Sequence, residues 1–394
     1  MTLLRSSKHA LTVLKLYNFF SYGAFAVLYT FFPIYFSQQG LSKLEIGMIM
    51  AGGPLISVLA NPFWGYISDR NQNIRKSIIF LLCGNLIVVQ FVFHTSVFVL
   101  LYALMLIFFF FVSPLNSQGN SLILNAIEGS KHKFGSFRLW GSLGYAVTAL
   151  STGPVIIAIG MSKLWLVYTF MMITSLLFTF GMPKGEVAAT TTGGFSSKGY
   201  GQVFRNKRFL LFLLLGVLIA VPNSSNSTFV SIYIQELGGS EVVIGSAAFI
   251  SAFFEIFVFL ALDRFIKRDT RYMLLALTVV IALFIVRWLL MSLAFLPIHI
   301  LMIQLLHCVT FGAYYYLGTM LTAQLIPIEY RASGQAAFAI TWGGISGIIA
   351  GVAGGWLYQA HGAISLYRVN VILALCGLIG FMIMLRLVGG SKKS

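Results

Sequence analysis

Two ionisable residues stand in the middle of long apolar runs. Glu255 lies in AAFISAFFEIFVFLALDRF, with no polar neighbour within three positions on either side, and Arg287 lies in ALFIVRWLLM. A charged side chain inside a bilayer is costly unless it is paired, protonated or faces a water-filled cavity. We therefore expect Glu255 and Arg287 to form a mutual ion pair that can bind and release a proton. A purely structural clamp is the alternative interpretation.

A polar stripe is predicted in the run QLLHCVTFGAYYY. Gln304, His307 and Thr310 recur at every third residue, which places them along one side of a helix. Histidine can carry a proton or donate a hydrogen bond to a solute hydroxyl. A stripe that serves only hydrogen-bonded packing is the alternative.

Amides and one further arginine also stand at the edges of apolar runs. PNSSNSTF places Asn223 and Asn226 on one face, after Pro222, which predicts a break in the helix. Asn120 lies in the polar part of SPLNSQGNSLILN, and Arg138 opens the following run. These side chains could bind a solute. A structural kink at Pro222 and a cytoplasmic anchor at Arg138 remain alternatives.

Two acid–base dipeptides occupy corresponding loops. Asp69-Arg70 and Asp263-Arg264 each follow an apolar run. Charge pairs at helix ends can latch one conformation and open in another, so we expect these residues to act as gates.

The composition shows which elements must position these residues. Of the 394 residues, 58% are hydrophobic and only 9% are charged, whereas soluble domains carry about 25% charged residues. Most of the exterior must therefore face lipid. The net charge of +16 does not indicate a nucleic-acid partner, because the basic residues cluster in short loops without interleaved aromatics. We find no nucleotide loop, catalytic triad, metal spacing or cofactor motif, so we expect no enzyme, no metal and no cofactor.

Apolar runs of roughly 20 residues, long enough to cross a bilayer as helices, recur along the chain. The continuous runs predict helices and exclude a membrane barrel, whose strands would alternate. The twelve expected spans are 11–36, 45–67, 76–96, 98–124, 138–160, 163–181, 209–235, 242–262, 272–293, 297–325, 332–359 and 364–388.

The basic residues fall almost entirely on one side of this arrangement. About 22 of the 26 Lys and Arg lie on the side of the N-terminus, the C-terminus and the loops between even and odd spans, and the opposite side holds only Lys43, Lys163 and Arg368. By the positive-inside rule, that side is cytoplasmic, and both termini lie there. We expect a multi-pass protein of the cell membrane.

The two halves of the chain resemble each other. PIYFSQQGLSKLEIG at 33–47 aligns without gaps to SIYIQELGGSEVVIG at 231–245, and two shorter pairs follow at a similar offset. This pattern predicts a duplicated six-helix unit. The expected domains are an N-terminal bundle over 1–182, a cytoplasmic linker over 183–207 and a C-terminal bundle over 208–394. A pseudo-symmetric pair of bundles with a cavity between them is typical of transporters.

At this point the sequence resembles the major facilitator superfamily. GYISDRNQNIRK at 65–76 is similar to the superfamily's loop signature, with Gln72 in place of the usual glycine. The segments FFSYGAF, SPL, FGSFRLWGS, NKRFL, VRWLLM and QLLHCVTFG resemble the 3-phenylpropionate permease group and the related lactose and nucleoside proton symporters. The resemblance covers nearly the whole chain. It implies the major facilitator fold, with twelve transmembrane helices in an all-α membrane protein.

The resemblance also implies roles for particular residues. Arg138 and Tyr145 match residues that engage solute, and Glu255, Arg287 and His307 match a proton-coupling network. Asn120 and Thr310 stand where the lactose symporters have carboxylates, so lactose transport is not implied. By elimination, Glu255 becomes the leading proton carrier.

These observations predict a secondary transporter that imports a small organic solute with protons by alternating access. The solute would be an aromatic acid such as 3-phenylpropionate, or a sugar or nucleoside. The expected solute-binding residues are Asn120, Arg138, Tyr145, Asn223, Asn226, Gln304, His307 and Thr310. The expected partners are the solute, protons and the lipid bilayer, and we expect a monomer. A proton-coupled efflux antiporter, indicated by Gly153-Pro154, and a non-transporting receptor or scaffold are the alternatives.

Overall fold

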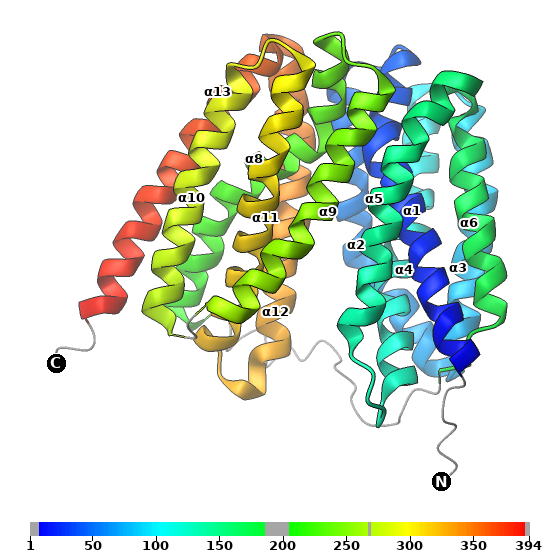
Figure 1. Ribbon diagram of the computed structural model, residues 1–394, viewed down its shortest axis with the longest axis horizontal. Helices are drawn as coiled ribbons and strands as arrows, with labels where there is room; N and C mark the ends of the chain where they lie inside the picture. The colour runs from blue at the N-terminus through cyan, green and yellow to red at the C-terminus, as the bar shows by residue number, and fades with distance from the viewer. Residues whose placement is uncertain (1–7, 186–204, 267–268, 391–394) are drawn as a thin grey trace. The chain divides into compact units, whose positions relative to one another are not determined.

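The computed structural model describes residues 8–185, 205–266 and 269–390 (Figure 1). Contacts divide the chain into two units. Unit 1 consists of Met1–Leu41, Gly52–Ala189 and Gly239–Phe253, and unit 2 of Ser42–Ala51, Thr190–Gly238 and Phe254–Ser394. The predicted linker at 183–207 lies mostly outside the described residues, and the domain limits at 182 and 208 stay predictions.

The first half of the chain forms six long helices. They are α1 (Lys8–Gln38), α2 (Lys43–Asn71), α3 (Ile74–Phe93), α4 (Phe98–Ile127), α5 (Phe134–Ile159) and α6 (Leu164–Phe180), with the 3-10 turn η1 (Met161–Lys163) before α6. Helix α1 packs against α5 and α6, and α3 packs against α4 and α6. Of these helices α1 is the most deeply buried.

The second half contains α8 (Lys207–Glu236), α9 (Glu241–Phe265), α10 (Thr270–Ser292) and α11 (Pro297–Leu325). A 3-10 turn η2 (Ile328–Tyr330), a short helix α12 (Arg331–Ala339), a π-helical segment η3 (Ile340–Ile345) and α13 (Ser346–Gly390) follow. Helices α8 and α10 both pack against α13, and α10 also packs against α11 (Figure 1). Here α8, the first helix of its half, is the most deeply buried.

Gly362 interrupts the last long helix. Within the described residues, eleven helices are long and apolar enough to span a membrane, and the last of them runs over Ser333–Leu387. Gly362 lies inside it with φ 78° and ψ 173°, a left-handed conformation that suits glycine because it has no Cβ. The break falls between the predicted spans 332–359 and 364–388, so this helix contains two membrane crossings.

The internal repeat is also visible in the geometry. Gly40 and Gly238 occupy equivalent places in the aligned segments, and both have positive φ, 87° and 86°. The equivalent tyrosines make equivalent contacts: the Tyr35 hydroxyl donates to the carbonyl of Phe93 at the end of α3, and the Tyr233 hydroxyl donates to the carbonyl of Met291 at the end of α10. Each half therefore ties its first helix to its third in the same way.

Gln72 shows why the loop signature of the superfamily contains a glycine. This residue has φ 47°, the left-handed conformation that costs a side-chain-bearing residue about 1–2 kcal/mol. The turn keeps the glycine-like backbone although its residue is glutamine, so the departure from the signature does not change the local fold.

Large apolar side chains cover the outside of both units. Examples that are more than half exposed are Leu59, Phe80, Val99, Phe170, Leu260 and Ile372. Such a surface would be insoluble in water and is stable against lipid tails.

Candidate functional site

In unit 1, the predicted solute-binding residue Arg138 lies on an aromatic platform. Its guanidinium carbon is 4.4 Å from the centre of the Tyr22 ring, which is within the range of a cation–π interaction. A Cβ added to Gly141 would lie 2.8 Å from the same ring, so the ring is closely packed against the backbone of α5. The Arg138 side chain itself is exposed and can reach a solute.

The Tyr22 ring connects Arg138 to the amides of α4. Its hydroxyl donates to Asn116 Oδ1 at 2.6 Å, and the Asn120 side-chain amide donates to the same oxygen at 3.1 Å. The structure therefore brings Asn120 and Arg138 into one network through Tyr22 and Asn116.

Helix α1 positions Tyr22 by polar contacts on both sides. The Asn18 amide donates to the carbonyl of Phe137 on α5 at 3.1 Å, and Ser21 shares a hydrogen bond of 2.6 Å with Ser175 on α6. Polar groups buried in a membrane protein hold helices in register because they find no water as an alternative partner. Tyr145 lies further along α5 and is half-buried.

In unit 2, Arg287 is fully buried. The carbon of its guanidinium lies 4.2 Å from the centre of the Trp288 ring, and its Nη1 donates to the Thr310 hydroxyl at 3.4 Å. Among the described residues its Nε and Nη2 have no hydrogen-bond partner. Arg287 is thus held by an aromatic face and one hydroxyl.

The ion pair between Glu255 and Arg287 stays a prediction, because the hydrogen bond described for the Arg287 guanidinium goes to Thr310. Glu255 is half-buried on α9, and its Cγ would lie 3.3 Å from a Cβ added to Gly312 on α11. The acid therefore lies along α11, while the guanidinium is turned toward Trp288 and Thr310. Helices α9 and α10 nevertheless place Glu255 and Arg287, respectively, against α11.

The predicted stripe on α11 is divided between two environments. Gln304 and Thr310 are buried, at 3% and 0% exposure, whereas His307 is half-buried. The His307 ring stacks on Phe311 with 5.3 Å between ring centres, and its Nδ1 has no partner within the part of the chain that the structure describes.

The two asparagines of α8 are both buried. Asn226 accepts a hydrogen bond of 3.1 Å from Tyr367 on α13, and Asn223 Oδ1 has no partner among the described residues. The break predicted at Pro222 is wrong, because α8 continues through it. A proline removes only one backbone donor, and membrane helices tolerate this loss when neighbouring groups accommodate it.

The predicted gating residues lie at exposed helix ends. Asp69 and Arg70 end α2, and Asp263 and Arg264 end α9. Asp263 accepts a hydrogen bond of 3.3 Å from Tyr316. Arg264 lies over the ring of Phe265. The gating role of these four residues stays a prediction.

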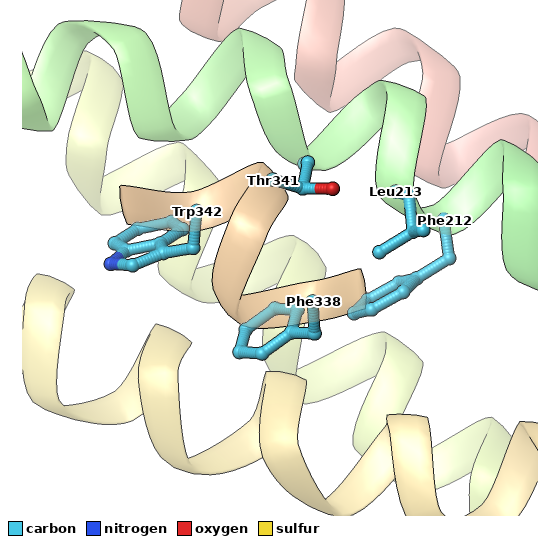
Figure 2. A pocket seen from close by; sticks show the side chains of 6 residues that line it. Phe212, Leu213, Phe338, Thr341 and Trp342 are labelled. Carbon is cyan, nitrogen blue, oxygen red and sulfur yellow. The ribbon is translucent and has the colours of Figure 1, made fainter. Parts of the chain in front are cut away.

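A small apolar hollow lies beside the π-helical segment. Figure 2 shows the residues that line it, Phe338 on α12, Thr341 and Trp342 on η3, and Phe212 and Leu213 on α8, and the space between them is too small to hold a solute. The Thr341 hydroxyl is engaged by the carbonyl of Ala337. This hollow offers no charged group to a solute, so we do not place the solute there.

Reasoning from the sequence missed the aromatic partners of both arginines. Trp288 follows Arg287 directly, a signal available in the sequence. Tyr22 lies on a different helix from Arg138, and no local pattern connects them. In each case, an arginine in an apolar run needs a partner, and an aromatic ring supplies one without a second charge.

Comparisons with known proteins agree with this architecture. The model of the MFS_1 like family matches residues 11–369. The chain is 25% identical over 390 residues to the maltose permease of Geobacillus stearothermophilus, covering 95% of this chain and 94% of the permease. It is 24% identical over 354 residues to the probable 3-phenylpropionic acid transporter of Escherichia coli (strain K12), covering 87% and 89%.

A solved structure shares the fold. A crystal structure of a mutant of the nucleoside transporter NupG superposes with a TM-score of 0.84 at 15% sequence identity, covering 95% of this chain and 99% of that one. These findings favour transport over a receptor or scaffold. Because the family model matches most of its length, this chain belongs to the MFS_1 like family and is a membrane transporter rather than an enzyme.

Proposed function

We propose that this transporter imports a small organic solute together with protons, by alternating access across the cell membrane. The observation that supports it is the group of ionisable residues around α11 of unit 2. Glu255 lies against Gly312, and Arg287 donates to Thr310. Ionisable groups inside a membrane protein are costly, and they usually mark a path for protons or ions.

Glu255 is the proposed proton carrier. It is half-buried on an apolar helix, and a carboxyl group in such a place is less costly when it can take up a proton. His307 and Arg287 complete the proposed coupling group. Protonation of Glu255 removes a negative charge beside α11, which Arg287 also contacts, and makes this region more positive. This change would favour the binding of an anionic solute from the outside.

The proposed solute-binding residues come from the polar clusters of both units. In unit 1 they are Asn120, Arg138 and Tyr145. In unit 2 they are Asn223, Asn226, Gln304, His307 and Thr310. The named relatives support three solute classes, since one is a maltose permease, one is a putative nucleoside transporter and one a probable 3-phenylpropionic acid transporter. The two arginines favour an acid among these classes.

Uptake into proteoliposomes tests this function. Purified protein is reconstituted with an alkaline interior, and labelled maltose, uridine and 3-phenylpropionate are offered outside. We expect one of them to accumulate above its external concentration and to leak out again when a protonophore collapses the gradient. Accumulation that persists after the protonophore is added would contradict proton coupling. A solute that leaves the vesicles as protons enter would identify the efflux antiporter instead.

A further inference from the structure

Arg287 presents a complete hydrogen-bonding edge that nothing occupies. Its Nη1 is used by Thr310, and its flat face is covered by Trp288. The Nε–H and the Nη2–H point along the same side of the guanidinium, and both are without a partner in the described residues. This side is the pair of parallel donors that an arginine offers to the two oxygens of a carboxylate.

Leaving the two donors of this edge without partners is energetically unfavourable. The side chain is 0% exposed, so bulk water does not satisfy it. A buried charge without a counter-charge destabilises a protein. The cation–π contact with Trp288 offsets only part of this cost. We therefore interpret these two unpartnered donors as a binding site for a hydrogen-bond acceptor.

The neighbouring groups indicate what the occupant looks like. Trp288 stacks on Phe284 and on Tyr367, so the surroundings are aromatic and dry. The Trp288 indole N–H and the Tyr314 hydroxyl are also buried without a partner in the described part of the chain. The occupant therefore combines a carboxylate with a body that can pack against aromatic rings and bond these two polar groups.

We propose that the Nε–Nη2 edge of Arg287 is the subsite that binds the carboxylate of the transported solute. This inference rests on the proposed function, because it requires that the chain imports a small organic solute. Glu255 supplies the proton and does not fill the edge, since its side chain lies along Gly312. The subsite is closed in this structure, and solute enters it in a state that exposes the edge.

Binding of matched acid and neutral compounds to the purified full chain in detergent tests the proposal. One pair is 3-phenylpropionate and 3-phenylpropan-1-ol, and the other is glucuronate and glucose. The members of each pair differ at the carboxylate and share the rest of their skeleton. Isothermal titration is measured for the wild type, Arg287→Lys, Arg287→Gln and the control Arg386→Gln, which removes the same charge from an exposed position on α13.

We expect one acid to bind about tenfold more tightly than its neutral partner, as a charge-assisted bidentate contact predicts. Arg287→Lys keeps the charge but loses the pair of parallel donors. It should weaken binding of that acid about tenfold and leave the affinity for the neutral compound unchanged. The control should bind like the wild type. If Arg287→Gln does not fold, the lysine variant decides.

Two results would overturn the proposal: neither acid binds more tightly than its partner, or Arg287→Lys binds the preferred acid like the wild type. If the edge instead binds Glu255 in another conformational state, we expect the first result, in which neither acid binds more tightly than its neutral partner. Transport of a neutral solute with protons, without preference for acids, would refute the subsite and leave the proposed function standing. Failure of every solute to accumulate in proteoliposomes would refute the proposed function itself.

Discussion

The Arg138 guanidinium lies over the Tyr22 ring, 4.4 Å from its centre, although the two residues belong to different helices. The ring is closely packed against the backbone at Gly141, and its hydroxyl donates to Asn116 Oδ1 at 2.6 Å. An exposed arginine has many conformations, and each one lost on binding costs free energy. Tyr22 reduces this cost because it restricts Arg138 before the solute arrives.

We therefore predict that Tyr22 positions Arg138. Tyr22→Leu removes the ring and should raise the KM for uptake about threefold to fivefold, as the loss of an exposed cation–π contact implies. Tyr22→Phe keeps the ring and loses the hydrogen bond to Asn116, so its effect should be smaller. The rise should appear in KM more than in kcat. Tyr66→Leu, at an exposed site on α2, is the control. An unchanged KM in Tyr22→Leu would refute the positioning role.

A second prediction concerns the proton carrier. Glu255→Gln keeps the size of the side chain but cannot bind and release a proton. Uphill accumulation driven by a pH gradient should fall to the background level, while exchange of labelled for unlabelled solute across the membrane should persist. Raising the external pH should slow uptake by the wild type and leave exchange by the variant unchanged.

The matched control for this variant is Glu241→Gln, which removes the same charge from the first turn of the same helix, away from the apolar run. It should accumulate solute like the wild type. Full uphill accumulation by Glu255→Gln would show that another group carries the proton, and His307 would be tested next.

The helices and the repeat could be predicted from the sequence because their signals are local. A run of about 20 apolar residues has few alternatives to a membrane helix. The left-handed glycines Gly40 and Gly238 stand in the segments that align. The break in α13 at Gly362 also lies between two predicted spans. These features depend on residues that are close together in the chain.

The partners of the charged groups could not be predicted in the same way. The approximate depths of Glu255 and Arg287 follow from the sequence, but the rotation of α9 and α10 about their axes does not. That rotation turns Arg287 to Thr310 and Glu255 to Gly312. The link between Arg138 and Tyr22 likewise depends on how α1 packs on α5. Long-range packing, rather than local preference, decides these contacts.

A third prediction concerns that packing. At Gly144 a Cβ would collide with the carbonyl oxygen of Phe19 and lie 2.7 Å from its Cα, so α1 and α5 approach through their backbones. Gly144→Ala must separate the helices, and overpacking of this kind should lower the melting temperature in detergent by about 2 to 10 °C. Gly135→Ala makes the same change on the same helix where nothing lies within 4 Å. It should leave the melting temperature unchanged or raise it slightly. Equal shifts in the two variants would contradict the close approach.

The last prediction tests the orientation of the chain in the membrane. Ser130 lies in the basic loop between α4 and α5, and Ser162 lies in η1 between α5 and α6; both are exposed. The positive-inside rule places Ser130 in the cytoplasm and Ser162 outside. Each serine is replaced by cysteine in a chain from which Cys83, Cys308 and Cys376 have been removed. A membrane-impermeant maleimide should label Ser162→Cys on intact cells and Ser130→Cys only after permeabilisation. The cysteine-free chain should not be labelled under either condition. The reverse pattern would place both termini outside, and uptake driven by an inward proton gradient would then have to be reassigned to export.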